Sequence, residues 1–198
     1  HQLKDLVRSE HVFQLVAPDL PHDFPALKSL GALPNNLPVQ LTSFVGRERE
    51  LAETKRLLDT THLLTLSGPG GTGKTRLSLQ LAADMLDTFA DGVWLVELAP
   101  LADPALVASS LAATLGMREQ PGRPVREALL DYLRGRSTLL LLDNCEHLIE
   151  ACAQLADALL RACPHLKLIA SSREPLGIAG EVAYRVPPLS MPGLSGEA

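Results

Sequence analysis

The chain has 198 residues, of which 46% are hydrophobic and 21% charged, a composition typical of a globular protein with one substantial core. Its net charge of −5 disfavours nucleic-acid binding through bulk charge. No apolar run reaches the ~18 residues that span a bilayer and no secretory signal is visible, so we expect a cytoplasmic segment that contacts neither nucleic acid nor membrane directly.

The first 42 residues differ in character from the rest. Residues 1–20 contain the alternating stretch His11–Val16, which predicts a short strand or hairpin left from the end of an upstream domain. Residues 21–42 carry several prolines, which favour extended backbone and predict an interdomain linker. Because the chain begins at His1 rather than Met, we expect it to be a segment of a longer protein.

From residue 43 onward, strand-like and helix-like stretches alternate. A helix is expected to end near Asp59, and the elements that follow are, in chain order, a strand at 63–67, a helix at 76–86, a strand at 93–98, helices at 104–115 and 125–133, a strand at 138–142, a helix at 147–162, and strands at 166–171 and 183–186. Apolar strands alternating with helices predict an α/β three-layer sandwich, with a parallel sheet of about five strands and helices on both faces. We assign residues 43–190 to this domain and 191–198 to a tail.

The three cysteines are Cys145, Cys152 and Cys163. Their spacing fits neither a disulfide framework nor a zinc site. Cys152 and Cys163 fall on the apolar face of the helix at 147–162, so we expect reduced thiols that pack in the core.

A glycine-rich loop joins the strand at 63–67 to the next helix and fits the phosphate-binding pattern G-x-x-x-x-G-K-[ST]. Its glycines allow the backbone N–H groups to turn inward around phosphate oxygens, and the helix adds its free N-terminal donors. Lys74 supplies an ammonium for the β- and γ-phosphates, and the Thr75 hydroxyl suits Mg²⁺. The predicted contacts of this P-loop are Gly68, Pro69, Gly70, Gly71, Thr72, Gly73, Lys74, Thr75 and the adjoining Arg76.

A second pattern overlaps this loop. Gly68, Gly70 and Gly73 also fit the dinucleotide fingerprint G-x-G-x-x-G, with Glu97 near the end of the next strand as the candidate ribose-binding acid. That interpretation leaves Lys74 and Thr75 without a role, so we favour a P-loop NTPase fold that binds ATP or ADP with Mg²⁺.

An acidic group follows the strand at 138–142. Asp143 would arrive at the carboxyl edge of the sheet, where ligands of open α/β sheets collect, and we predict that it serves Mg²⁺ together with Thr75. Glu146 is either a general base that polarises the attacking water or a first-turn acid of the next helix. Asn144 is an alternative group to orient a water.

The strand at 166–171 ends in Ser171-Ser172-Arg173. A guanidinium at that edge has the forked donors that match phosphate oxygens, so Arg173 is predicted to detect the γ-phosphate. The alternative is a surface arginine paired with Glu174 or Glu181. The predicted catalytic set is Lys74, Asp143, Glu146 and Arg173.

Several ordered motifs together resemble the nucleotide-binding domains of STAND-type signalling ATPases, the class that includes NB-ARC proteins. The likeness is closest to AfsR-like and LuxR-type bacterial regulators. The motifs lie at residues 37–51, 92–99, 141–148 and 171–176.

The resemblance implies that Val45 and Arg47 lie near the adenine, that Asp143 serves Mg²⁺, and that Arg173 detects the γ-phosphate. It also implies a regulatory switch that is off with ADP and on with ATP and is reset by slow hydrolysis. Partners would be the other domains of the same chain, with self-association on ATP binding.

Residues 1–20 resemble the closing strands of class III adenylate/guanylate cyclase domains, which implies a cyclase-like domain upstream. Two other functions therefore stay open. One is an accessory ATPase module of a cyclase, and the other is an NTPase motor with rapid turnover.

Overall fold

A computed structural model describes residues 33–38, 44–118 and 121–188. The predicted cyclase-like remnant and the tail at 191–198 lie outside these residues.

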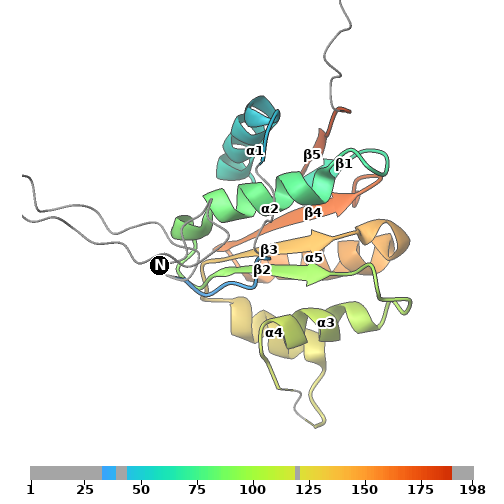
Figure 1. The fold of residues 1–198 in the computed structure, drawn as a ribbon. Helices are drawn as coiled ribbons and strands as arrows, with labels where there is room; N and C mark the ends of the chain where they lie inside the picture. The colour runs from blue at the N-terminus through green and yellow to red at the C-terminus, as the bar shows by residue number, and fades with distance from the viewer. Residues whose placement is uncertain (1–32, 39–43, 119–120, 189–198) are drawn as a thin grey trace, which may run out of the picture.

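Five strands form one sheet in the order β2-β3-β4-β1-β5, and every neighbouring pair is parallel (Figure 1). The strands are β1 (Leu63–Ser67), β2 (Val93–Glu97), β3 (Thr138–Asp143), β4 (Leu166–Ser172) and β5 (Glu181–Arg185). The predicted parallel sheet of about five strands is confirmed.

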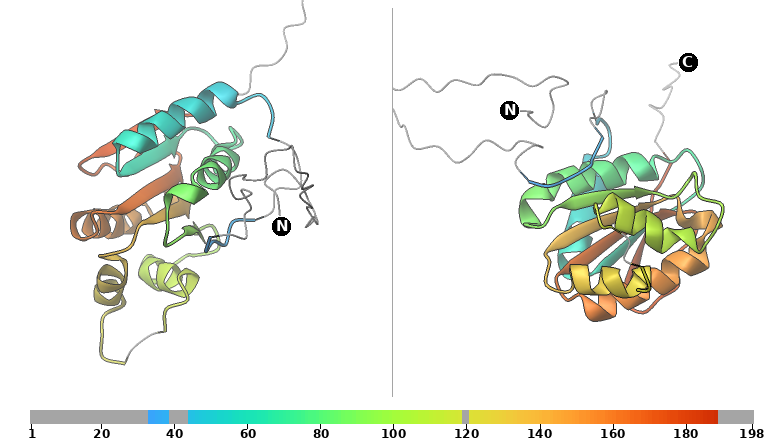
Figure 2. Two further views of the ribbon diagram at one scale, coloured as in Figure 1. Left: turned by 90° about the vertical axis from the view of Figure 1, so that its left-hand side faces the viewer. Right: turned by 90° about the horizontal axis from the view of Figure 1, so that it is seen from below.

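Helices cover both faces of this sheet, and the two further views in Figure 2 show the same layering. The helices are α1 (Glu48–Thr60), α2 (Lys74–Asp84), α3 (Leu106–Thr114), α4 (Val125–Leu133) and α5 (Ile149–Ala162), with short 3₁₀ turns η1 (Leu86–Thr88) and η2 (Cys145–His147). In the described part of the chain, no helix combines the length and the apolar character that crossing a membrane requires.

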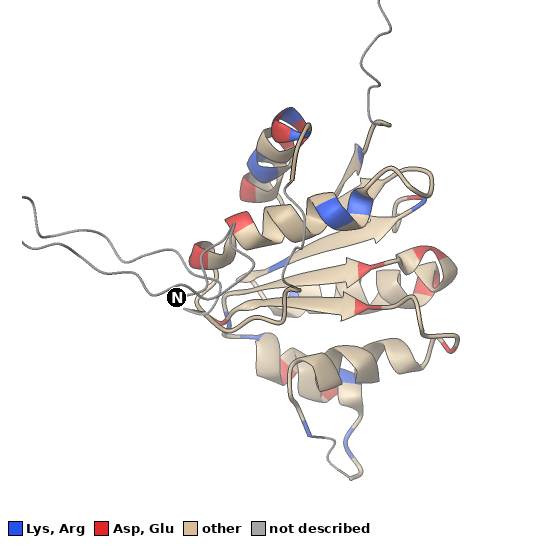
Figure 3. Cartoon of the chain, viewed as in Figure 1, with Lys and Arg blue, Asp and Glu red and all other residues tan. Residues whose placement is uncertain are grey.

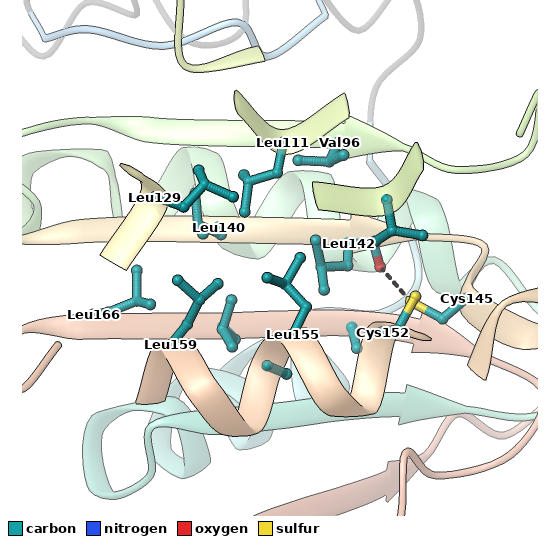
Figure 4. Close-up of a cluster of buried hydrophobic side chains, with 14 of the residues drawn as sticks. Val96, Leu111, Leu129, Leu140, Leu142, Cys145, Cys152, Leu155, Leu159 and Leu166 are labelled. Carbon is teal, nitrogen blue, oxygen red and sulfur yellow. Dashed lines mark hydrogen bonds between the residues drawn. The ribbon is translucent and has the colours of Figure 1, made fainter. Parts of the chain in front are cut away.

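The central strand β3 shows why the fold has three layers. Leu139 and Leu141 pack with α1 and α2 on one face, whereas Leu140 and Leu142 pack with α3, α4 and α5 on the other. Successive side chains of a strand point to opposite faces, so a strand covered on both sides is apolar throughout. Figure 4 shows the second of these clusters.

The three cysteines are free and buried, as predicted for core packing. Cys145 and Cys152 lie in the cluster of Figure 4. The neighbouring Cys152 thiol and burial raise the pKa of the Cys145 thiol above its usual value. This position therefore disfavours the reactive thiolate.

Residues 33–38, which fall inside the predicted linker, lie along the outer edge of β2 (Figure 1). Val93 N donates to Pro34 O at 3.1 Å, and Asn35 forms a parallel bridge with Val93. The Asn36 side chain pairs with both backbone groups of Leu95, accepting from its N at 2.7 Å and donating to its O at 2.9 Å. This edge segment (residues 33–38) thus occupies backbone groups on the outer edge of β2.

Candidate functional site

The loop between β1 and α2 has the backbone that its glycines predict. Gly73 precedes the first residue of α2 with φ = 84°, a left-handed conformation that favours glycine, and a Cβ placed there would meet no atom within 4 Å. Gly68 has φ = 142°, and its Cβ would lie 3.2 Å from the carbonyl oxygen of Val186. The loop therefore packs on one side against the chain after β5 and stays open on the other.

Lys74 folds back over this loop. Its Nζ donates to Gly68 O at 2.8 Å and to Pro69 O at 3.0 Å. Because α2 begins at Lys74, the N–H groups of its first turn have no partner within the helix. An ammonium and free helix donors thus meet at one place, which is an arrangement suited to an anion. Figure 3 shows positive residues at this end of α2.

A second cluster joins three elements at the carboxyl edge of the sheet. The Oδ1 atom of Asp143, at the end of β3, accepts a hydrogen bond from Thr75 Oγ1 of α2 at 2.8 Å. The same oxygen accepts a short hydrogen bond from Ser171 Oγ of β4. Ser171 Oγ in turn accepts from the backbone N of Asn144 at 3.0 Å. The two residues predicted to serve Mg²⁺ are therefore direct neighbours.

These oxygen donors fit a magnesium ion. A hydroxyl and a carboxylate are hard ligands, and Mg²⁺ is commonly held by one or two protein oxygens together with waters and phosphate oxygens. The described residues contain no group of three or more His, Cys, Asp or Glu side chains that could hold a metal by themselves. The donor set here therefore matches a metal that arrives with a phosphate ligand rather than a closed protein cage.

Glu146 and Arg173 lie beside this cluster as an ion pair, with 3.3 Å between Arg173 Nε and Glu146 Oε1. The Arg173 side chain is 70% exposed, whereas that of Glu146 is only 20% exposed. The second oxygen of Glu146, Oε2, is buried and has no hydrogen-bond partner. Glu181, one of the alternative partners considered for Arg173, instead accepts from the backbone N of Leu176 and Gly177.

The helix predicted from about His147 is divided in two in the structure. Helix α5 begins at Ile149, later than the predicted start at 147, and the acid of its first turn is Glu150. The reason is Asn144, whose left-handed backbone (φ = 67°) starts the separate turn η2 that contains Glu146. Glu146 is therefore the acid in the first turn of the short helix η2 rather than of α5, and its role as a general base stays a prediction.

The side chain of Asn144 contacts this turn. Its Nδ2 lies 3.3 Å from Nδ1 of His147, whose Nε2 lies within hydrogen-bond distance of the carbonyl oxygens of Leu98 and Leu101. His147 thereby fastens η2 to the chain after β2. Sequence reasoning missed this role because no local pattern links His147 to a segment more than 40 residues earlier.

The residues expected near the adenine have contrasting environments. Val45 is 75% exposed, whereas Arg47 is 4% exposed and donates from Nη2 to the carbonyl oxygens of Thr72 and Pro187, both at 2.8 Å. Arg76 is exposed at the third position of α2. Glu97 is exposed at the carboxyl end of β2.

A sequence family described as "AAA domain" matches residues 56–178 of the chain. The chain belongs to this family. The matched range includes the loop, Asp143 and Arg173, and it supports the P-loop interpretation over the dinucleotide fingerprint. The predicted P-loop NTPase fold is confirmed.

Curated relatives of this AAA domain occur in Mycobacterium and Streptomyces. An uncharacterized protein of Mycobacterium tuberculosis is 46% identical over 151 residues, which are 76% of this chain and 38% of that protein. A second M. tuberculosis protein, whose name proposes an HTH-type transcriptional regulator, is 45% identical over 69% of this chain and 15% of its own length. The regulatory protein AfsR of Streptomyces griseus is 32% identical over 63% of this chain and 14% of its own length. The chain thus spans well under half of each relative.

Two solved structures have a similar fold. The STAND protein with a tetratricopeptide repeat sensor from Pyrococcus horikoshii aligns with a TM-score of 0.53 at 16% identity, over 74% of this chain and 24% of its own. Cdc6p from Pyrobaculum aerophilum aligns with a TM-score of 0.54 at 21% identity, over 80% of this chain and 48% of its own. At these identities the likeness is one of fold.

Proposed function

We propose that this AAA domain is an ATP/ADP-binding switch within a multidomain transcriptional regulator and that it hydrolyses ATP slowly with Mg²⁺. The observation that carries the proposal is the meeting of the P-loop with the Asp143 cluster at one edge of the sheet. The loop and Lys74 would hold the phosphates, and Thr75 and Asp143 would hold the metal, which neutralises phosphate charge when bound. The names of the two regulator relatives support the proposed setting.

The ion pair of Glu146 and Arg173 supports slow rather than rapid hydrolysis. One oxygen of Glu146 is held by a guanidinium, and the other is buried without a partner. While the pair holds, Oε1 of Glu146 contacts the guanidinium instead of an attacking water. The Arg173 side chain is largely exposed, and turning toward a γ-phosphate would break its pair with Glu146, so hydrolysis would wait for this exchange of partners.

Nucleotide binding tests this proposal, with Lys74→Ala as the variant. Loss of charge-assisted hydrogen bonds worth about 1.5–3 kcal/mol should weaken binding of both MgATP and MgADP by roughly 10- to 150-fold, measured by titration calorimetry on the intact protein. Lys55→Ala, at an exposed lysine of α1, is the matched control and should bind as the wild type does. Unchanged affinities in Lys74→Ala would refute the site.

Turnover tests the switch separately. We expect far less than one ATP per second, because slow reset keeps the two states distinct. Sustained hydrolysis at about 1 per second or faster, as in ordinary enzymes, would contradict the switch and favour a motor.

A further inference from the structure

Arg47 is a buried arginine that connects three separate parts of the chain. It precedes α1, and only 4% of it is exposed. Its Nη2 donates to Thr72 O in the P-loop and to Pro187 O after β5, each at 2.8 Å, while Nη1 lies 3.3 Å from Glu50 Oε1. A terminal guanidinium nitrogen carries two hydrogens, so these two carbonyls use both hydrogens of Nη2.

The chain after β5 also lies directly against the loop. We define Val186–Pro188 as the exit segment. Val186 N donates to Ser67 O, the last residue of β1, at 2.8 Å, and Val186 O lies 3.2 Å from where a Cβ on Gly68 would be. The exit segment therefore extends the pairing of β5 with β1 up to the first residue of the P-loop.

We propose that Arg47 is a positioning residue that couples phosphate binding in the P-loop to the exit segment. This inference rests on the proposed nucleotide site. Thr72 belongs to the loop whose N–H groups would face the phosphates, so a bound phosphate fixes the Thr72 carbonyl. The Arg47 guanidinium keeps its hydrogen bond to that carbonyl, because a buried guanidinium that loses its partners carries a large desolvation penalty. Through the same nitrogen it then holds Pro187, and nucleotide occupancy is conveyed to the chain that leaves the sheet.

A purely structural arginine would have the same contacts, so the test must follow the response to nucleotide. Hydrogen exchange of the intact protein, read by mass spectrometry, is measured without nucleotide, with MgADP and with MgATP. Pro187 and Pro188 have no amide hydrogen, so the exit segment is followed through Val186 and the loop through Gly71–Lys74. In the wild type, we expect nucleotide to slow exchange at both places, at Val186 by about fivefold or more.

The deciding variant is Arg47→Met, which keeps an unbranched side chain but removes every donor. At nucleotide concentrations raised until each variant is saturated, whatever its affinity, we expect slower exchange in the loop, whereas exchange at Val186 becomes independent of nucleotide. Arg49→Met, at an exposed arginine on the same helix, is the matched control and should respond at both places as the wild type does.

Every other outcome of this experiment also supports or overturns the coupling. Slowing of about fivefold or more at Val186 in Arg47→Met would overturn the coupling while leaving the nucleotide site intact. If Arg47→Met fails to fold or to bind, Arg47→Gln, whose amide nitrogen stops two bonds short of Nη2, is measured in the same way. Loop slowing without a Val186 response in that variant supports the coupling, and slowing at both places overturns it. Loss of loop slowing in both variants would place Arg47 in binding itself and overturn the coupling. A wild type without loop slowing would refute the nucleotide site and the coupling together.

Discussion

Replacement of Glu146 by Gln separates a general base from a merely structural acid. The change keeps the size of the side chain and removes its charge. If Glu146 draws the proton from the attacking water, hydrolysis should fall by about 10²- to 10⁴-fold. That range corresponds to roughly 3–5 kcal/mol in the activation barrier.

The structure predicts a much smaller effect on stability. The pair with Arg173 involves a side chain that is 70% exposed, and such surface ion pairs contribute only about 0–1 kcal/mol. The amide of the Gln variant would meet the same buried position in which Oε2 has no partner. We therefore expect the free energy of unfolding to change by about 1 kcal/mol, far less than the barrier to hydrolysis.

The assay is single-turnover hydrolysis of ATP with the protein in excess, so that product release does not limit the rate. Glu150→Gln is the control, because Glu150 is exposed in the first turn of α5 and its Oε1 accepts from Gln154. We expect the control to hydrolyse at the wild-type rate and both variants to bind MgATP normally. A Glu146→Gln rate within about threefold of the wild type would refute the assignment of a general base.

Two further predictions concern the phosphate sensor and the edge of the sheet. Arg173→Ala should weaken the binding of MgATP by roughly tenfold or more and leave the binding of MgADP nearly unchanged, since only ATP has the γ-phosphate. Equal losses of affinity for the two nucleotides in calorimetry would argue against a γ-phosphate sensor. Gly92→Ala should lower the free energy of unfolding, measured in urea, by more than about 1 kcal/mol, because Gly92 has φ = 100° and a Cβ there would overlap Pro34 O. Gly135→Ala, where a Cβ meets no atom within 4 Å, is its control, and an equal cost in both would contradict the close approach at Pro34.

The buried strands were predictable because a short run of apolar residues, bounded by polar ones, is typical of a strand that is covered on both faces. The stretch 63–67 is a strand with the same bounds in the structure, and 138–142 lengthens by one residue to include Asp143. The last strand was placed at 183–186 but spans Glu181–Arg185. It lies at the end of the sheet, and none of its residues is fully buried, so its sequence carries no apolar run to mark its ends.

The candidate site was predictable only where topology decides contacts. The carboxyl ends of parallel strands meet at one edge, which brings Asp143 beside Thr75 without any knowledge of side-chain detail. The pair of Glu146 with Arg173 and the bonds of Arg47 to Thr72 and Pro187 depend instead on side-chain directions across distant segments. No periodicity or spacing in one sequence encodes those directions.

The docked edge segment at residues 33–38 has a consequence for how this domain can associate. An exposed strand edge presents unpaired backbone groups that invite another strand, and β2 would be such an edge. Here the amide of Asn36 pairs with both backbone groups of Leu95, so at this residue the chain itself occupies the groups that another strand would need. Among the described strands, β5 is the other outer strand of the sheet. A neighbouring domain or copy that joins by strand addition would therefore find Val93 and Leu95 of β2 already paired and would meet β5, on the same side as the exit segment.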